Sequence, residues 1–205
     1  MRTLDQIGQL AADYIDSPTD PEVIGYSISG VRECVDFLNQ RCWSFQLVVS
    51  GFGFIAGQQE YTFPNGIKQP RHLSIVDAAG TRTPVGYTDY KSFTIENQAI
   101  NHGNPTIYTV IPGTNTVRLN GAPTADTIAT QPSGEFAYFE RIAFPTVTAS
   151  GVVVPTEVER LLIEYARAFA AERYDSDKVG PPTQRFQYGF RQLRANESEA
   201  LDWSE

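Results

Sequence analysis

The sequence predicts an α+β fold, in which N- and C-terminal helices form a bundle and an antiparallel β-sandwich or barrel domain is inserted between them. Apolar residues recur at helical spacing near both ends of the 205-residue chain, and short β-rich runs between turn residues fill its middle. Each terminal helix shows a single apolar stripe, which packing against the other helices would bury. We therefore expect a helical domain of residues 1–44 and 152–205, and an inserted β domain of residues 45–151.

The first region is expected to form two helices. Apolar residues recur every three or four positions over residues 4–15, after which the pattern breaks. A second helix is expected to begin where Asp20 supplies an N-cap and Pro21 takes the first helical position. Gly25 and Gly30 weaken this helix by roughly 1 kcal/mol each relative to Ala, so tertiary packing must stabilise it.

Short strands are expected through the middle region, because several runs alternate apolar and polar residues as half-buried antiparallel strands do. The runs are residues 60–63, 73–76, 107–111, 116–119 and 137–141. Pro112 and Gly113 lie between two of these runs and supply turn geometry, which predicts a hairpin over residues 110–117.

The last region is expected to form two more helices. Thr156 is followed three residues later by Glu159, a spacing that predicts a capping box at the start of the first one. Apolar residues over positions 158–170 then follow the helix period closely. A Gly-Pro-Pro break at residue 180 precedes a final helix that carries Phe186 and Phe190 and leads into an acidic end.

Charge and cysteine usage exclude several classes of function. The formal net charge is −8, and the 16 basic residues are spread along the chain. Because nucleic-acid binding needs clustered Lys and Arg, we expect no sequence-specific DNA binding. No stretch approaches the roughly twenty apolar residues of a membrane span, so we expect no membrane partner. Cys34 and Cys42 are placed on one helix about 12 Å apart along its axis, and are predicted to be unpaired.

Candidate reactive residues do not assemble into a catalytic pattern. His72 and His102 lie in the β region with no recognisable partner. The glycines of Gly51–Gly57 depart from the spacing of a nucleotide-binding loop, so a flexible β edge or loop is the favoured interpretation. We expect no catalytic residue, no cofactor and no metal site.

The carboxylates of the region after residue 155 allow two interpretations. Glu157, Glu159 and Glu164 could be paired carboxylates for hydrolysis. The favoured interpretation is a capping box and a solvated helix face, with Glu164 reaching Arg160 or Arg167.

Several short motifs, many with Tyr or Pro, follow one another along nearly the whole chain. They are Cys42-Trp43-Ser44-Phe45, Gly57-Gln58-Gln59-Glu60-Tyr61-Thr62-Phe63-Pro64, Gly103-Asn104-Pro105-Thr106-Ile107-Tyr108, Val117-Arg118-Leu119-Asn120-Gly121-Ala122-Pro123, Phe136-Ala137-Tyr138-Phe139, and Val154-Pro155 before an alanine-rich helix. Their order and spacing resemble those of the head-to-tail adaptor (connector, head-completion) proteins of tailed bacteriophages. The sequence departs from that family's patterns at Phe63, which stands for Leu, and at Gly121, which stands for Pro.

This resemblance implies a structural virion protein at the head–tail junction, which is present in the host cytoplasm during assembly. Adaptor subunits form a ring, commonly of twelve copies, that extends the DNA channel and completes the head. The implied partners are the portal protein, a downstream tail or nozzle protein, further copies of the chain, and packaged DNA that passes through without sequence-specific binding.

The resemblance also places contacts to the portal or to neighbouring subunits near the C-terminus. The candidate contact residues are Phe186, Phe190, Arg191, Arg194, Leu201 and Trp203. Trp203 is an amphipathic aromatic residue in a charged segment, which suits anchoring in a pocket of a partner. A frayed terminus is the alternative.

Two other classes of function stay open. A tail or baseplate component, or a β-sandwich receptor-binding module, would be favoured if the β domain folded alone and bound saccharide. An enzyme such as a peptidoglycan hydrolase would require a Glu–Asp pair in a cleft.

Overall fold

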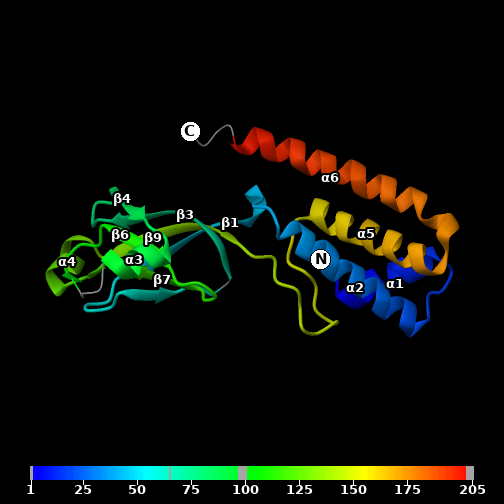
Figure 1. Ribbon diagram of the computed structural model, residues 1–205, viewed down its shortest axis with the longest axis horizontal. Helices are drawn as coiled ribbons and strands as arrows, with labels where there is room; N and C mark the ends of the chain where they lie inside the picture. The colour runs from blue at the N-terminus through cyan, green and yellow to red at the C-terminus, as the bar shows by residue number, and fades with distance from the viewer. Residues whose placement is uncertain (1, 65, 97–100, 202–205) are drawn as a thin grey trace. The chain divides into compact units, whose positions relative to one another are not determined.

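The computed structural model describes residues 2–64, 66–96 and 101–201, and the chain divides into two compact units (Figure 1). The helical unit comprises Met1–Phe45 and Ile142–Glu205, and the β unit comprises Gln46–Arg141. Residues 142–151, which were expected in the β domain, therefore belong to the helical unit. Their backbone explains this, because the N–H groups of Leu4 and Asp5 donate to the carbonyls of Ser150 and Thr148 at 3.0 and 3.1 Å.

Four long helices build the helical unit: α1 (Leu4–Tyr14), α2 (Pro21–Leu38), α5 (Thr156–Tyr174) and α6 (Gly180–Leu201). Helix α5 packs against α1 and α2, and α6 packs against α5, so the N- and C-terminal segments share one core (Figure 1). This confirms the predicted α+β fold with a helical bundle. The predicted N-cap of α2 is present, because the Asp20 side chain accepts from the Glu22 N–H at 2.9 Å.

The prediction of a capping box at the start of α5 is wrong. The helix begins at Thr156, Pro155 is its N-cap, and no side chain caps it. Because Thr156 already has helical geometry, its hydroxyl cannot occupy the cap position. The Glu159 carboxylate instead accepts from Arg2 Nη1 at 2.8 Å. Glu159 is buried, so it does not belong to the solvated face on which the sequence placed it.

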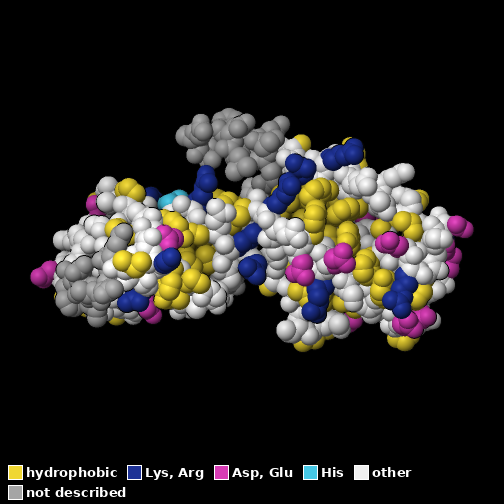
Figure 2. All heavy atoms as spheres, in the orientation of Figure 1, with side chains coloured by type: hydrophobic (Ala, Val, Ile, Leu, Met, Phe, Trp, Pro, Cys, Tyr) yellow, Lys and Arg dark blue, Asp and Glu magenta, His cyan; other side chains and the backbone are white. Residues whose placement is uncertain are grey.

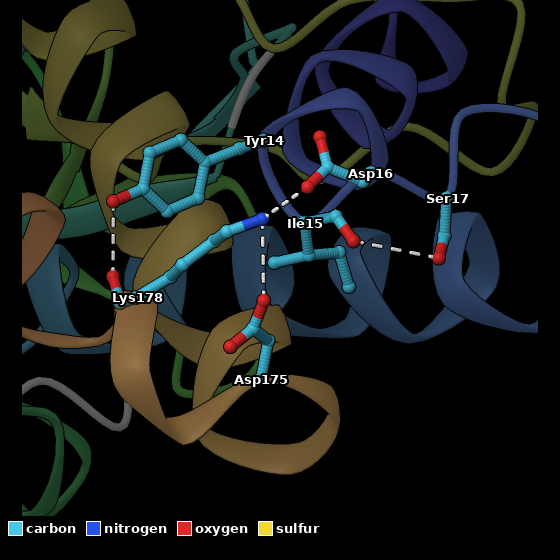
Figure 3. Close-up of polar contacts among 6 residues, drawn as sticks. All are labelled: Tyr14, Ile15, Asp16, Ser17, Asp175 and Lys178. Carbon is cyan, nitrogen blue, oxygen red and sulfur yellow. Dashed lines mark hydrogen bonds and ion pairs between the residues drawn. The ribbon is translucent and has the colours of Figure 1, made fainter.

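A polar cluster ties the end of α1 to the turn that precedes α6 (Figure 3). Lys178 lies in the short 3-10 turn Ser176–Lys178, and its Nζ contacts the carboxylates of Asp16 at 2.5 Å and Asp175 at 3.2 Å. The Tyr14 hydroxyl donates to the Lys178 carbonyl at 3.0 Å. The hydrogen bond to Asp16 is the main cause that raises the pKa of Lys178. These contacts help to hold the turn from which α6 starts.

The β unit is built on one curled seven-stranded sheet that forms a half-barrel. In spatial order its strands are β1 (Leu47–Gly53), β9 (Ser133–Glu140), β3 (Ile67–Val76), β4 (Arg82–Tyr87), β6 (Ile107–Val110), β7 (Thr116–Leu119) and β2 (Glu60–Thr62). The predicted hairpin between β6 and β7 is present, with Gly113 at φ +75° in its turn. Gly is suited to this left-handed conformation because it has no Cβ.

One pairing within the seven-stranded sheet departs from the expected antiparallel arrangement, because β4 and β6 are parallel. A parallel pair needs a crossover of about a dozen residues or more. The segment between Tyr87 and Ile107 supplies it and contains the short helix α3 (Tyr90–Glu96), which the sequence did not predict. Further short elements are β5 (Asn101–His102), which pairs with β8 (Gly121–Ala122), and α4 (Ala125–Thr130).

Aromatic side chains form much of the core of the β unit. The rings of Phe63 and Phe136 lie 5.0 Å apart, and those of Phe136 and Tyr138 also lie 5.0 Å apart. The Phe52 ring of β1 lies 4.8 Å from that of Tyr61 in β2, so side chains from the two edge strands of the curled sheet meet. The motif aromatics Tyr61, Phe63, Tyr108, Phe136 and Tyr138 are all buried, which accounts for them as core residues.

Neither Cys34 nor Cys42 forms a disulfide, as predicted. They do not share a helix, because α2 ends at Leu38, before Cys42. Burial raises the pKa of the Cys34 thiol to about 12, so it stays protonated at neutral pH. Within the described residues, no helix is both long and apolar enough to cross a membrane.

Candidate assembly surface

Helix α6 holds five of the six predicted contact residues, and its two phenylalanines face inward. The Phe186 ring lies 5.1 Å from Tyr165 of α5, and the Phe190 ring lies 5.2 Å from Phe37 of α2. Phe190 also meets the buried Trp43 edge-on at 5.7 Å. Both phenylalanines are half-buried against the helical core. Their main observed role is therefore to attach α6 to its own bundle.

The two predicted contact arginines of α6 do not join the hydrophobic core of the bundle. Arg191 and Arg194 are exposed, and no carboxylate among the described side chains lies within salt-bridge distance of either. Figure 2 shows basic side chains near the C-terminal half of α6, bordering an apolar surface. Leu201 is the last residue of α6, but its side chain lies outside the described residues, as does the whole of Trp203.

The C-terminal end of α6 extends beyond its partner helix. Gly189 lies against Leu161 of α5, since a Cβ added at Gly189 would lie 2.6 Å from Leu161 Cδ2. Helix α5 begins at Thr156, five residues before Leu161, and the two helices run antiparallel. The first residue of α5 therefore lies level with a point about five residues past Gly189, near Arg194. The last seven residues of α6, roughly 10 Å of helix, have no counterpart on α5.

A groove of about 500 Å³ lies between α5 and α6. Its apolar lining comes from Phe45, Val158, Leu161 and Leu193, and Gly189 allows the close approach of the two helices at Leu161. Its polar lining residues are Ser44, Glu157, Arg160, Glu164, Arg185, Gln192 and Asn196. An apolar floor with a polar rim is typical of surfaces that receive a side chain of a partner.

The charged residues around the groove differ in how far they are already paired. Glu164 accepts from Arg167 at 2.9 Å, and its Oε2 lies 3.7 Å from Arg185 Nη1. Glu164 thus contacts Arg167, as the sequence suggested, and not Arg160. Arg160 is exposed and has no carboxylate within salt-bridge distance among the described side chains. The uncapped N-terminus of α5 adds partial positive charge beside it.

Tyr165 joins α5 to α2 next to these residues. Its hydroxyl donates to Glu33 Oε1 at 2.9 Å, and its ring stacks on Phe169 at 6.2 Å. Burial is the main cause that raises the pKa of Tyr165, and the Glu33 carboxylate adds to it. The hydroxyl therefore stays protonated and available as a donor.

A second candidate surface is the edge strand β1. Its last residues, Gly51–Gly53, belong to the segment that the sequence predicts to be a flexible β edge or loop. The N–H of Phe54 points to the Pro132 carbonyl at 2.9 Å, on the β9 side. Since backbone groups alternate in direction along an antiparallel strand, those of Leu47, Val49, Gly51 and Gly53 point to the open edge. The exposed fractions of Leu47 and Val49 are 44% and 56%, and β1 contains neither charge nor Pro. The consecutive β-favouring apolar residues Leu47–Val49 are the signal that could have indicated this strand.

The residues weighed for catalysis are not brought together. His72 lies exposed on β3, and the side chain of His102 lies outside the described residues. Among the side chains that the structure describes, no group of three or more His, Cys, Asp or Glu is placed to hold a metal ion.

A family model described as SU10 adaptor protein matches residues 2–204. The chain belongs to the SU10 adaptor protein family. The match includes both the helical unit and the β unit of this adaptor-family protein.

Two solved structures are similar to parts of this adaptor-family protein. One is a chain of the neck of an empty GTA particle computed with C6 symmetry, at 16% identity and a TM-score of 0.29, covering 80% of this chain and 79% of that one. The other is a chain of the neck of a native GTA particle computed with C12 symmetry, at 16% identity and a TM-score of 0.29, covering 89% and 90%. Among curated proteins, none matches the sequence significantly. The family match therefore carries the assignment.

Proposed function

We propose that this chain is a structural adaptor subunit that forms a ring between the portal and the tail of a phage-like particle, completes the head and extends the DNA channel. The observation that carries this proposal is the adaptor-family match over residues 2–204, which includes every helix of the bundle and every strand of the sheet. The ring, commonly of twelve copies in such proteins, would place the chain at the head–tail junction of the virion.

The partners follow from that role. The helical unit would face the portal protein, and the β unit would face a downstream tail or nozzle protein. DNA would pass through the ring without sequence-specific contacts, which agrees with a net charge of −8 because acidic surfaces do not retain phosphates. An acidic subunit also stays soluble until it is recruited.

The contacts to the portal or to a neighbouring subunit would lie on the outer side of α6 and beyond its end. Arg191 and Arg194 are exposed there, and the projecting last turns of α6 lead to Leu201 and Trp203. Phe186 and Phe190 would contribute to these contacts indirectly, because they pack α6 against the rest of the bundle. A polar outer face and a projecting end are features that a subunit of an assembly can place against a partner.

The test is negative-stain imaging with mass determination of the purified protein alone and mixed with portal rings from the same genome. Rings of the protein, or a second tier that appears only on portal rings, would support the adaptor proposal. The chain truncated before Leu201 is then compared with Arg191→Glu, to separate the role of the terminal segment from that of the α6 face. A monomer that ignores portal rings at low and high salt would contradict the proposal.

A further inference from the structure

Helix α6 has a basic exposed face over the residues whose side chains the structure describes. Residues 180–196 contain three arginines and no acid. Four exposed residues at helical spacing form what we call the α6 stripe: Gln184, Tyr188, Arg191 and Arg194. Neither arginine of the stripe has a carboxylate within salt-bridge distance among the described side chains. Tyr188 is 65% exposed, and Tyr and Arg are residue types that are enriched in interfaces.

Helix α1 carries a stripe of the opposite charge. The helix contains no base, and three exposed residues four positions apart form what we call the α1 stripe: Asp5, Gln9 and Asp13. Asp13 lies in the last turn of α1, where the helix dipole disfavours a negative charge. No base among the described side chains lies within salt-bridge distance of Asp13. The stability of α1 therefore does not account for this acid, and a partner that brings positive charge would compensate it.

The two stripes are not paired within one copy. Helix α5 packs against both α1 and α6, and no ion pair among the described residues joins α1 to α6 (Figure 1). The bases that contact the ends of the helical unit near α1 are already paired, because Arg2 contacts Glu159 and Lys178 contacts Asp16. The β unit is a poorer counterpart for the α6 stripe, since residues 46–141 contain nearly as many bases as acids. A second copy of α1 therefore fits the α6 stripe best in charge.

We infer that the α6 stripe of one copy packs against the α1 stripe of a second copy, with Arg191 and Arg194 beside Asp13. This inference rests on the proposed function in one respect, that copies associate. The two stripes lie at different places on the helical unit, so the contact is heterologous and of the kind that can close into a ring. Copies with a net charge of −8 repel one another, and this contact brings opposite charges together where they meet.

Two full-length variants test the contact by exchanging its charges. The first carries Arg191→Glu and Arg194→Glu, which makes the α6 stripe acidic. The second carries Gln9→Arg and Asp13→Arg, which makes the α1 stripe basic. Each variant alone then places like charges together, so its self-association in sedimentation velocity at low salt should be about tenfold or more weaker than that of the unmodified chain.

An equimolar mixture of the two variants brings opposite charges together again at each contact between unlike copies. We expect the mixture to associate about tenfold or more tightly than either variant alone, and added salt should weaken this association. Both variants remain acidic overall, so their net charges do not attract them to each other. A mixture that associates no more tightly than its components would overturn the inference, as would an unmodified chain that shows no salt-sensitive self-association.

Two further variants separate a packed contact from a general effect of charge. Lys91→Glu alters an exposed base of the β unit, and this protein should associate as the unmodified chain does. Tyr188→Ala leaves the charge unchanged and should weaken association about threefold or more, because it removes an aromatic ring from the contact. Far-UV circular dichroism checks the fold of every variant. Equal weakening by Lys91→Glu and by the exchanged α6 stripe would contradict a contact at α6.

The same samples separate this inference from the proposed function. If the unmodified protein adds a tier to portal rings while the mixture gains nothing, the adaptor role stands and the contact between copies is wrong. If the mixture associates as expected but no ring or tier forms, the contact stands and the adaptor role is wrong. If the first variant fails to join portal rings even in the mixture, the α6 stripe binds the portal, and the inference is overturned.

Discussion

A buried carboxylate shows how tertiary contacts assign the role of a single residue. Glu159 is 7% exposed in the first turn of α5, and its carboxylate accepts from Arg2 Nη1 at 2.8 Å. Burying a carboxylate costs hydration free energy, which hydrogen bonds or an opposite charge must offset. Arg2 precedes α1, so this ion pair connects the N-terminal segment of the helical unit to α5.

Arg2→Ala should destabilise the helical unit, because it removes an ion-pair partner from a buried carboxylate. We expect a loss of about 1–2 kcal/mol in the free energy of unfolding, measured by urea denaturation followed by circular dichroism. Glu157→Gln, at an exposed position two residues before Glu159, is the control and should change stability by less than about 0.5 kcal/mol. Equal midpoints for Arg2→Ala and the unmodified chain would show that Glu159 does not depend on this pair.

Helix α2 shows that helix propensity and tertiary packing can have opposite effects on the stability of one element. Both Gly25 and Gly30 lower its helix propensity. A Cβ at Gly30 would lie 2.8–2.9 Å from Phe169 of α5, whereas nothing lies within 4 Å of a Cβ at Gly25. Gly30 thus allows α2 and α5 to approach closely, and Gly25 has no such role.

The two glycines form a matched pair for mutation. Gly25→Ala should stabilise the protein by about 0.5–1 kcal/mol through helix propensity. Gly30→Ala should destabilise it by about 1–3 kcal/mol, because the Cβ and ring of Phe169 leave no room for a methyl group. Thermal unfolding of both variants measures the difference. A stabilising Gly30→Ala would mean that α2 and α5 separate at little cost.

The edge strand β1 makes a prediction about solubility. Its exposed apolar side chains and outward backbone groups form a surface on which strands of other molecules can pair. Val49→Lys should reduce self-association of the purified protein in static light scattering, with little change in thermal unfolding, because the side chain faces solvent. Val153→Lys is the control, since Val153 is 80% exposed but lies outside any strand. An equal effect of both variants would point to general surface charge and not to the edge.

At the scale of the whole molecule, the two units differ in how their cores are assembled from the chain. The β unit is continuous from Gln46 to Arg141 and has its own core cluster, whereas the helical unit needs both ends of the chain. We therefore expect residues 46–141 to fold when produced alone, with dispersed amide signals in a two-dimensional NMR spectrum. Residues 1–45 alone should remain unfolded, because α1 and α2 would lose α5. A collapsed, poorly dispersed 46–141 spectrum would show that the β unit depends on the helices.

The β unit should also lose stability in acid. Hydrogen bonds lower the pKa of Asp77 and of Asp89, the former mainly through the N–H of Thr81 and the latter through Ser92. The hydrogen bond from Arg82 lowers the pKa of Glu135. Because these pKa values are depressed on folding, the stability they provide is present above the ordinary pKa of about 4 and is lost as the pH falls through the folded values.

The acid effect is measured on residues 46–141 by thermal unfolding at pH 7 and pH 3. The midpoint should fall at pH 3, and it should fall less in the variant with Asp77→Asn, Asp89→Asn and Glu135→Gln, whose side chains no longer titrate. A pH dependence equal to that of the unmodified β unit would show that other groups control it.

Local signals in the sequence account for much of the fold. The cap formed by Asp20 and Pro21, the hairpin turn at Gly113 and the apolar period of α5 depend on residues close together in the chain, and each is present as predicted. The order of the motifs along the chain indicates the adaptor family, and the family match over residues 2–204 confirms it. These features were predictable because their energetics are local or their pattern is repeated within a family.

Other features depend on groups that are distant in the chain. The pairing of Arg2 with Glu159, the inward direction of Phe190, the parallel β4–β6 pair and the groove beside Arg160 each join segments whose approach no periodicity encodes. The α+β class, the main helices, a turn and the family could all be predicted from patterns of residues along the chain. Which side chains are left for partners depends on the folded protein, because burial is a property of packing and not of residue type.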